Sequence, residues 1–279
     1  RKAAGVDVLI GCNRVDSSEI AICGGTHLGF LRATGRPQRR SDRWQIALER
    51  RQYERASVIV AHSKLMHDEL RELYGIDEAK IRVLYPPVDG TRFTEVDGAQ
   101  RAELRRKFGF ADHEIVLLFP SSSHERKGLP LIEAALRECG LPVVLAVAGR
   151  PPAHTSSQIR YIGYVKDIED AYRAADFTLL ASKYEPFGLV GVESVMCGTP
   201  VIFPSSIGCC DAIADHAKFV FAPDDVNDLR ATLARAVRQW QANPANAGAV
   251  AGGAVLYDAS VESHVDALLD LATEIVARR

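Results

Sequence analysis

The sequence predicts an α/β protein built on parallel β-sheets. Short apolar runs, such as residues 177–181, are typical of strands buried on both faces of a sheet. They alternate with segments in which apolar residues recur at helical spacing, as in residues 188–197. Gly198 and Pro200 end that helix before the next apolar run, residues 201–203. This order of strand, loop, helix and strand predicts a parallel sheet whose loops bind a ligand at one edge.

Length and composition fit a globular protein of one large or two ordinary domains. The chain has 279 residues, a formal net charge of −2 and 47% hydrophobic residues. No apolar run approaches the ~20 residues that span a bilayer, and no secretory signal is recognised after Arg1. The six cysteines lack zinc or redox spacing, so we expect a reduced, cytoplasmic compartment. Because no D-x-D triplet occurs, we expect no metal ion and no cofactor.

Residues 1–92 are predicted to form a first domain. Its strands are expected at the apolar runs 6–11, 19–23, 56–61 and 80–84. Ser63 is a suitable N-cap for a helix over residues 64–74. Residues 24–27 predict a turn that places His27 just beyond a strand end.

Residues 93–260 are predicted to form a second domain, and residues 261–279 a helix that packs back on the first. Strands of the second domain are expected at residues 115–119, 142–149, 160–163, 177–181, 201–203 and 218–221. Its helices are expected at residues 168–175, 188–197 and 225–240. The last helix carries an apolar stripe that we expect to lie in the core: Val261, Val265, Leu268, Leu269, Ala272, Ile275 and Val276.

Two carboxylates mark the loop and helix that follow residues 177–181. Gly188 and Leu189 are expected to present free backbone N–H groups at the helix start, where a phosphate binds well. From Gly188 to Glu193 a helix rises about 7 to 8 Å, which is the span from a nucleotide's outer phosphate to its ribose. Glu193 is thus a candidate for the ribose hydroxyls, and Glu185 for the group attached beyond the phosphates. The simpler alternative is that acids favour a helix start, and it suits Glu185 better than Glu193.

The pattern E-P-F-G-L-x-x-x-E, followed by G-T-P-V, resembles the donor-site motif of retaining GT-B glycosyltransferases of the GT4 type. The resemblance implies two Rossmann-like domains facing a cleft. It places Phe187 in the donor site beside the two glutamates, Gly188 and Leu189. R-K-G after residues 115–119 is similar to the diphosphate-binding loop of that family, which makes Arg126 and Lys127 donor-binding candidates.

Two departures from the family pattern qualify the resemblance. Many relatives carry an arginine where this chain has Ser121 and Ser122. Members that resemble the lipopolysaccharide-core glucosyltransferases also lack this arginine, so the chain is more similar to their branch. A loop usually written G-G-x-x-E corresponds here to residues 208–211, with cysteine for one glycine and Asp211 for the acid. That exchange leaves the contacts to the donor sugar open.

His27 is the acceptor-side candidate. In the family resemblance its G-G-x-H segment lies on the acceptor side of the cleft, so His27 binds or deprotonates the acceptor hydroxyl. A turn histidine without a role is the competing interpretation. GT4 enzymes are thought to pass that proton to the leaving phosphate.

An arginine-rich segment spans Arg32 to Arg55, opposed by Asp42, Glu49 and Glu54. It is interpreted as a solvated helical face, a nucleic-acid patch, or a surface for anionic lipid or a phosphorylated acceptor. Given the donor motif we favour peripheral contact with an anionic membrane or acceptor. We expect no nucleic-acid partner, because the whole chain is not basic.

The first domain lacks the opening strand and glycine-rich loop of the family. At about 30 residues per β-α-β unit, roughly three units are missing. A half-sheet without its neighbours would expose apolar edges. We therefore expect a truncated form of a longer protein, which can bind donor and yet fail to turn over.

The expected function is transfer of a hexose from a nucleotide diphosphate sugar, such as UDP-glucose, to a hydroxyl of a glycan or glycolipid, with lipopolysaccharide core as one possibility. Lys127, Arg126 and the Gly188 amide end would offset the charge that grows on the diphosphate. No covalent nucleophile is evident, in keeping with the family's front-face retaining mechanism. The alternatives are a nucleotide-sugar epimerase of the same fold and a non-catalytic nucleotide-sugar-binding or scaffold protein.

Overall fold

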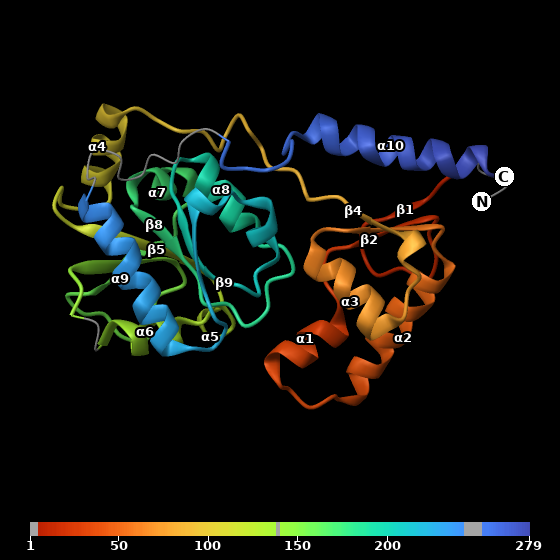
Figure 1. Cartoon of the computed structure of the whole chain (residues 1–279), viewed down its shortest axis with the longest axis horizontal. Coiled ribbons are helices and arrows are strands. Elements are labelled where there is room, and N and C mark those ends of the chain that lie inside the picture. The colour runs from red at the N-terminus through yellow and green to blue at the C-terminus, as the bar shows by residue number, and fades with distance from the viewer. Residues whose placement is uncertain (1–4, 138–139, 243–252) are drawn as a thin grey trace. The chain divides into compact units, whose positions relative to one another are not determined.

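The computed structural model describes residues 5–137, 140–242 and 253–279. It divides into two compact units, each of which is described by itself. The first comprises Arg1–Pro87, Tyr184–Phe187 and Tyr257–Arg279, and the second Val88–Lys183 and Gly188–Leu256. Both contain parallel sheets (Figure 1), so the predicted α/β fold class is confirmed.

The first unit contains a four-stranded parallel sheet in the order β1-β2-β3-β4. The strands are β1 (Ile10–Gly11), β2 (Ile20–Cys23), β3 (Val58–Ala61) and β4 (Ile81–Val83). β1 is shorter than the predicted run of residues 6–11, because only its last two residues pair with β2. Val6 and Leu9 at that end are 47% and 40% exposed.

Helices cover both faces of this sheet. One face contacts α1 (His27–Thr34), α2 (Arg40–Arg55) and α3 (Lys64–Tyr74) through Ala21, Cys23, Ile59 and Ala61. The predicted cap on α3 is confirmed, since Ser63 accepts a hydrogen bond from the Met66 N–H. The expected short connection after β2 is observed at residues 24–26, and His27 is the first residue of α1, where Thr26 accepts a hydrogen bond from the Gly29 N–H as the N-cap.

The other face of the sheet contacts α10 (Val261–Ala277). Ile275 is buried with Ile20, Val58 and Val60, and Leu268, Leu271 and Ala272 pack beside it. The predicted stripe was therefore partly wrong. The inward residues are spaced 268, 271, 272 and 275, whereas Val261, Val265, Leu269 and Val276 are 44% to 56% exposed.

The second unit contains a six-stranded, all-parallel sheet in the order β10-β9-β8-β5-β6-β7. Its strands are β5 (Ile115–Ser121), β6 (Val143–Gly149), β7 (Ile159–Gly163), β8 (Phe177–Leu179), β9 (Val201–Pro204) and β10 (Lys218–Phe221). The chain runs outward from β5 in one direction and from β8 in the other. In open α/β sheets such a reversal is where ligands bind.

Helices α4 (Gly98–Lys107), α5 (His124–Lys127), α6 (Leu129–Arg137), α7 (Ile168–Ala174), α8 (Leu189–Met196) and α9 (Val226–Ala242) complete the second unit. α6 and α9 lie side by side (Figure 1). Asp176 joins several elements: it accepts hydrogen bonds from Arg101 and Arg105 of α4 and from Trp240 of α9. It is 1% exposed, so this charge is buried with its partners.

Candidate functional site

The short helix α5, between β5 and α6, carries Arg126 and Lys127 in the segment predicted as a loop. Lys127 is 8% exposed, and its carbonyl accepts a hydrogen bond from the Ala181 N–H at 3.1 Å. Gly128 follows with φ +81°, and a Cβ there would lie 1.9 Å from the Ala181 oxygen. Only glycine fits this close approach, so the R-K-G sequence fixes the loop against the segment after β8.

A cleft of about 210 Å³ opens at the carboxyl ends of β5 and β6. It is lined by Pro120, Ser121, Ser122, Lys127, Ala148, Gly149, Tyr164, Val165 and Ile168. Lys127 and the loop after β7, with Tyr164 and Val165, therefore line the same cleft. Tyr164 is 83% exposed on that loop, so its ring has open space beside it.

Glu193 projects from α8 in the same unit. The Tyr172 hydroxyl donates a hydrogen bond to its Oε2 at 3.0 Å. Burial raises the pKa of Glu193 above its usual value, while that hydrogen bond and the charges of Arg92 and Lys127 oppose the rise. Tyr172 is fully buried, and no local sequence signal distinguishes it from a core tyrosine.

The start of α8 is suited to an anion. Gly188 is the N-cap, with φ 87° and ψ 70°, and among the described residues no side chain caps this end. Leu189 is 42% exposed at the first helical position. Backbone N–H groups at such an end attract negative charge.

The remaining predicted donor residues belong to the first unit. Phe187 is 5% exposed and stacks on Tyr85 with ring centroids 5.8 Å apart, and Tyr257 contacts both rings. Glu185 lies on the same short segment, Tyr184–Phe187. The structure thus brings Arg126, Lys127, Gly188, Leu189 and Glu193 into one unit, and His27, Glu185 and Phe187 into the other.

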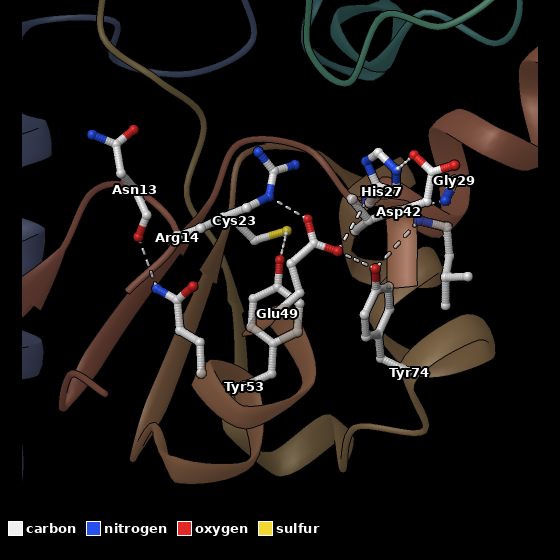
Figure 2. A network of polar contacts seen from close by, with 12 residues as sticks. Asn13, Arg14, Cys23, His27, Gly29, Asp42, Glu49, Tyr53 and Tyr74 are labelled. Carbon is white, nitrogen blue, oxygen red and sulfur yellow. Dashed lines mark hydrogen bonds and ion pairs between the residues drawn. The ribbon is translucent and has the colours of Figure 1, made fainter. Parts of the chain in front are cut away.

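His27 is held at two points (Figure 2). Its backbone N–H donates to Glu49 Oε2 at 3.1 Å, and its Nε2 lies 2.8 Å from Asp42 Oδ1. Asp42 also accepts hydrogen bonds from the Arg36 guanidinium and the Arg39 N–H, which hold its pKa far below the usual range. The His27 ring is 11% exposed and therefore has a fixed orientation at the start of α1.

Glu49 is the centre of a buried polar network in Figure 2. It is 0% exposed and accepts hydrogen bonds from Arg14 Nε at 2.5 Å, from the Tyr74 hydroxyl and from the His27 N–H. Neighbouring bonds from Tyr53 to Cys23 and from Gln52 to Asn13 extend the network. These contacts tie α2 to α1, α3 and the segment after β1.

Several arginines of the segment Arg32–Arg55 are used in ion pairs. Arg32 pairs with Glu72, Arg36 with Asp42, and Arg51 and Arg55 with Asp16. Arg40, Arg43 and Trp44 lie on the exposed side of α2, where Trp44 is 79% exposed. Part of the segment therefore forms ion pairs within the first unit, and part of it presents an exposed basic face.

The altered loop at residues 208–211 has a packing role. Gly208–Ala212 forms a 3₁₀ turn in which Cys209 is fully buried. A Cβ at Gly191 of α8 would lie 2.5 Å from Cys209 Sγ, so the thiol packs directly on that helix. Cysteine at this position supports α8.

The described residues, 5–137, 140–242 and 253–279, contain neither a cluster that could hold a metal ion nor a helix that could span a membrane. No group of three or more His, Cys, Asp or Glu side chains in them is placed to hold a metal ion. None of their helices has both the length and the apolar character that crossing a membrane requires.

Known families match both units. Residues 103–249 match the family model "Glycosyl transferases group 1", and residues 3–92 match "Glycosyltransferase Family 4". The chain belongs to the group 1 glycosyltransferases. The resemblance to GT4-type enzymes is thereby confirmed, and the chain is an enzyme of this class.

A relative that matches the whole chain is a probable transglycosylase from Burkholderia thailandensis, with 70% identity over 100% of this chain and 77% of the relative. The chain spans 43% to 60% of the length of seven other curated relatives.

Solved structures share the fold. WaaG, a glycosyltransferase involved in lipopolysaccharide biosynthesis, superposes with a TM-score of 0.73 at 20% identity, over 88% of this chain and 73% of WaaG. Anabaena HepE in complex with UDP-glucose gives 0.70 at 17% identity, over 92% and 79%.

Proposed function

We propose that the second unit binds the nucleotide diphosphate of a UDP-sugar and that the enzyme transfers the hexose with retention of configuration. The observation that carries this is the grouping of Lys127, the uncapped start of α8 and the half-buried Glu193 in one unit. A cation and free N–H groups suit a diphosphate, and a carboxylate suits the ribose hydroxyls. The UDP-glucose complex of HepE supports uracil as the base.

In this proposal each residue has a separate task. The acceptor oxygen bonds to the sugar's anomeric carbon, the bond to the leaving phosphate oxygen breaks, and the acceptor's proton passes to that phosphate. Lys127, Arg126 and the Gly188 amide end stabilise the negative charge that develops there. Glu185 binds the transferred sugar, and His27 contacts a hydroxyl of the acceptor. No metal ion is required, because the cations of the chain offset the charge.

The acceptor we propose is a glycan or glycolipid hydroxyl, with lipopolysaccharide core as a specific candidate that the likeness to WaaG supports. The exposed Arg40, Arg43 and Trp44 support peripheral contact with an anionic membrane on its cytoplasmic side. Arginine attracts anionic headgroups, and tryptophan prefers the membrane interface.

Calorimetric titration of the chain with UDP, GDP and ADP tests the donor site. UDP should bind best, and Glu193→Ala and Lys127→Ala should each weaken UDP by at least about tenfold, or ~1.4 kcal/mol. Glu103→Ala, an exposed change on α4, is the control and should leave UDP affinity unchanged. A folded wild-type chain that binds none of the three nucleotides would refute the proposal.

Turnover by the full-length protein separates the alternatives. Transfer from a UDP-sugar only in the presence of acceptor supports the transferase. Consumption of donor without acceptor would indicate an epimerase, and donor binding without any turnover a binding or scaffold protein.

A further inference from the structure

We propose that the two chain neighbours of Glu185 hold it in position. The Tyr184 hydroxyl is hydrogen-bonded in a buried polar site formed by Thr26 and Glu69, which we call the seat, and the Pro186 carbonyl accepts a hydrogen bond from Ser63, which we call the anchor. Tyr184 and Ser63 are then positioning residues for sugar transfer. This inference rests on the proposed function, in which Glu185 binds the transferred sugar.

The seat for Tyr184 is built from α1 and α3. Tyr184 is 8% exposed, and its hydroxyl accepts a hydrogen bond from the Thr26 N–H at 3.1 Å and donates one to Glu69 Oε2 at 2.9 Å. The ring of Phe30 meets the Tyr184 ring edge-on, with centroids 6.1 Å apart. Both the ring and the hydroxyl of Tyr184 are therefore fixed, over sequence separations of 158 and 115 residues.

Glu69 is itself held rigidly in this seat. It is 2% exposed, and the Thr26 hydroxyl donates to its Oε2 at 2.5 Å. Gly29 of α1 leaves the space that the carboxylate needs, since a Cβ there would lie 2.1 Å from both oxygens. Burial raises the pKa of Glu69, and the hydrogen bonds from Thr26 and Tyr184 favour its charged form. A buried carboxylate with two hydroxyl donors makes a rigid acceptor.

The other neighbour of Glu185 is anchored to the start of α3. The Ser63 hydroxyl donates to the Pro186 carbonyl at 2.6 Å. A Cβ at Gly25 would lie 3.1 Å from the Pro186 ring, so that ring rests on the backbone just before α1. Glu185 is thus flanked by two fixed residues.

The same caps place His27. Thr26 caps α1, whose first residue is His27, and it also bonds Tyr184. Glu185 and His27 therefore depend on one set of hydrogen bonds in the first unit. Because a misplacement of about 1 Å can cost 10²-fold in rate, loss of the Tyr184 hydroxyl should act through Glu185.

The test compares the affinities of UDP and UDP-glucose for the full chain. The ratio of the two dissociation constants isolates the contribution of the sugar. Glu185→Gln and Tyr184→Phe should each change this ratio by about tenfold in the same direction, with UDP affinity unchanged. The double variant should match Glu185→Gln alone, because a positioning residue adds nothing once its target is removed.

Tyr53→Phe is the matched control, since Tyr53 also buries its hydroxyl in the first unit, bonded to Cys23. It should leave the ratio unchanged even if it lowers stability. Ser63→Gly provides a second variant: glycine is tolerated as an N-cap, so α3 persists while the Pro186 anchor is lost, and the ratio should again shift.

The outcomes separate the two proposals. If UDP does not bind the folded wild type, the proposed function fails and this inference fails with it. If UDP binds and Glu185→Gln shifts the ratio while Tyr184→Phe and Ser63→Gly do not, the function stands and the positioning role is refuted.

Discussion

Three carboxylates are buried to different degrees and accept hydrogen bonds from different sets of donors: Glu49, Asp176 and Glu193. Glu49 and Asp176 are almost fully buried and accept hydrogen bonds from several side chains and backbone N–H groups. Glu193 is half-buried, and in the described part of the chain its one hydrogen-bond donor is Tyr172. An acid that keeps unused acceptor capacity and a raised pKa is typical of a binding site.

Glu193→Gln should therefore weaken UDP binding and increase stability at neutral pH. The pKa of Glu193 is raised by burial, so the folded state binds its proton more tightly than the unfolded chain does. The stability this provides is complete below the unfolded pKa of about 4.3 and is lost as pH rises through the folded pKa. The free energy of unfolding of the wild type minus that of the variant should therefore fall over this pH window and then level off.

Urea unfolding of both proteins at several pH values measures that difference. UDP affinity of the wild type should also fall as pH drops through the folded pKa, because a protonated acid accepts ribose hydroxyls less well. A difference in stability that stays constant with pH would contradict the assignment.

At the scale of elements, tight turns place the proposed diphosphate groups. Gly128 joins α5 to α6, and its absent side chain lets the loop touch the segment after β8. Gly109 has a similar φ of +70°, but a Cβ there would meet nothing within 4 Å. The two glycines share a left-handed backbone conformation, which only glycine adopts without strain, and they differ in packing.

Gly128→Ala should destabilise the chain more than Gly109→Ala. Both variants incur about 1 to 2 kcal/mol for a Cβ in the left-handed region, and Gly128→Ala incurs a further ~1 to 3 kcal/mol from the clash with Ala181. Because Lys127 precedes Gly128, UDP affinity should fall in that variant alone. Urea unfolding measures the stability, and calorimetry measures the UDP affinity. Equal losses of stability in the two variants would contradict the prediction, because they would show that the loop accommodates the Cβ at Gly128 with no loss of free energy.

At the scale of the whole molecule, each unit has its own core and its own buried ionic centre. Glu49 organises the first unit, and Asp176 the second. The two tryptophans are divided in the same way, with Trp44 in the first unit and Trp240 bonded to Asp176 in the second. Independent cores predict two unfolding transitions.

Glu49→Ala should lower the free energy of unfolding of the first unit, and Asp176→Ala that of the second. Removing one partner of a buried charge cluster costs about 3 to 5 kcal/mol. UDP at 100 times its dissociation constant should raise only the transition of the second unit, by about 2.7 kcal/mol. Urea unfolding of Trp44→Phe, followed by Trp240 fluorescence and by far-UV circular dichroism, measures this. Coincident transitions that both variants shift together would contradict it.

Local patterns along the chain were enough to predict the fold class, most strands and the helix at Lys64–Tyr74. Lys127, Gly188 and Glu193, which the sequence placed in one domain, lie in one compact unit. Apolar runs, helical periodicity and caps involve residues close along the chain, so they can be recognised without the fold. Three contacts could not be predicted from such patterns and are visible in the folded structure alone. Tyr172 donates a hydrogen bond to Glu193, residues 184–187 belong to the first unit, and the Tyr184 hydroxyl bonds both Thr26 and Glu69. The same holds for the side of α10 that is buried. These contacts join residues far apart in sequence, and they form only when packing brings the elements together.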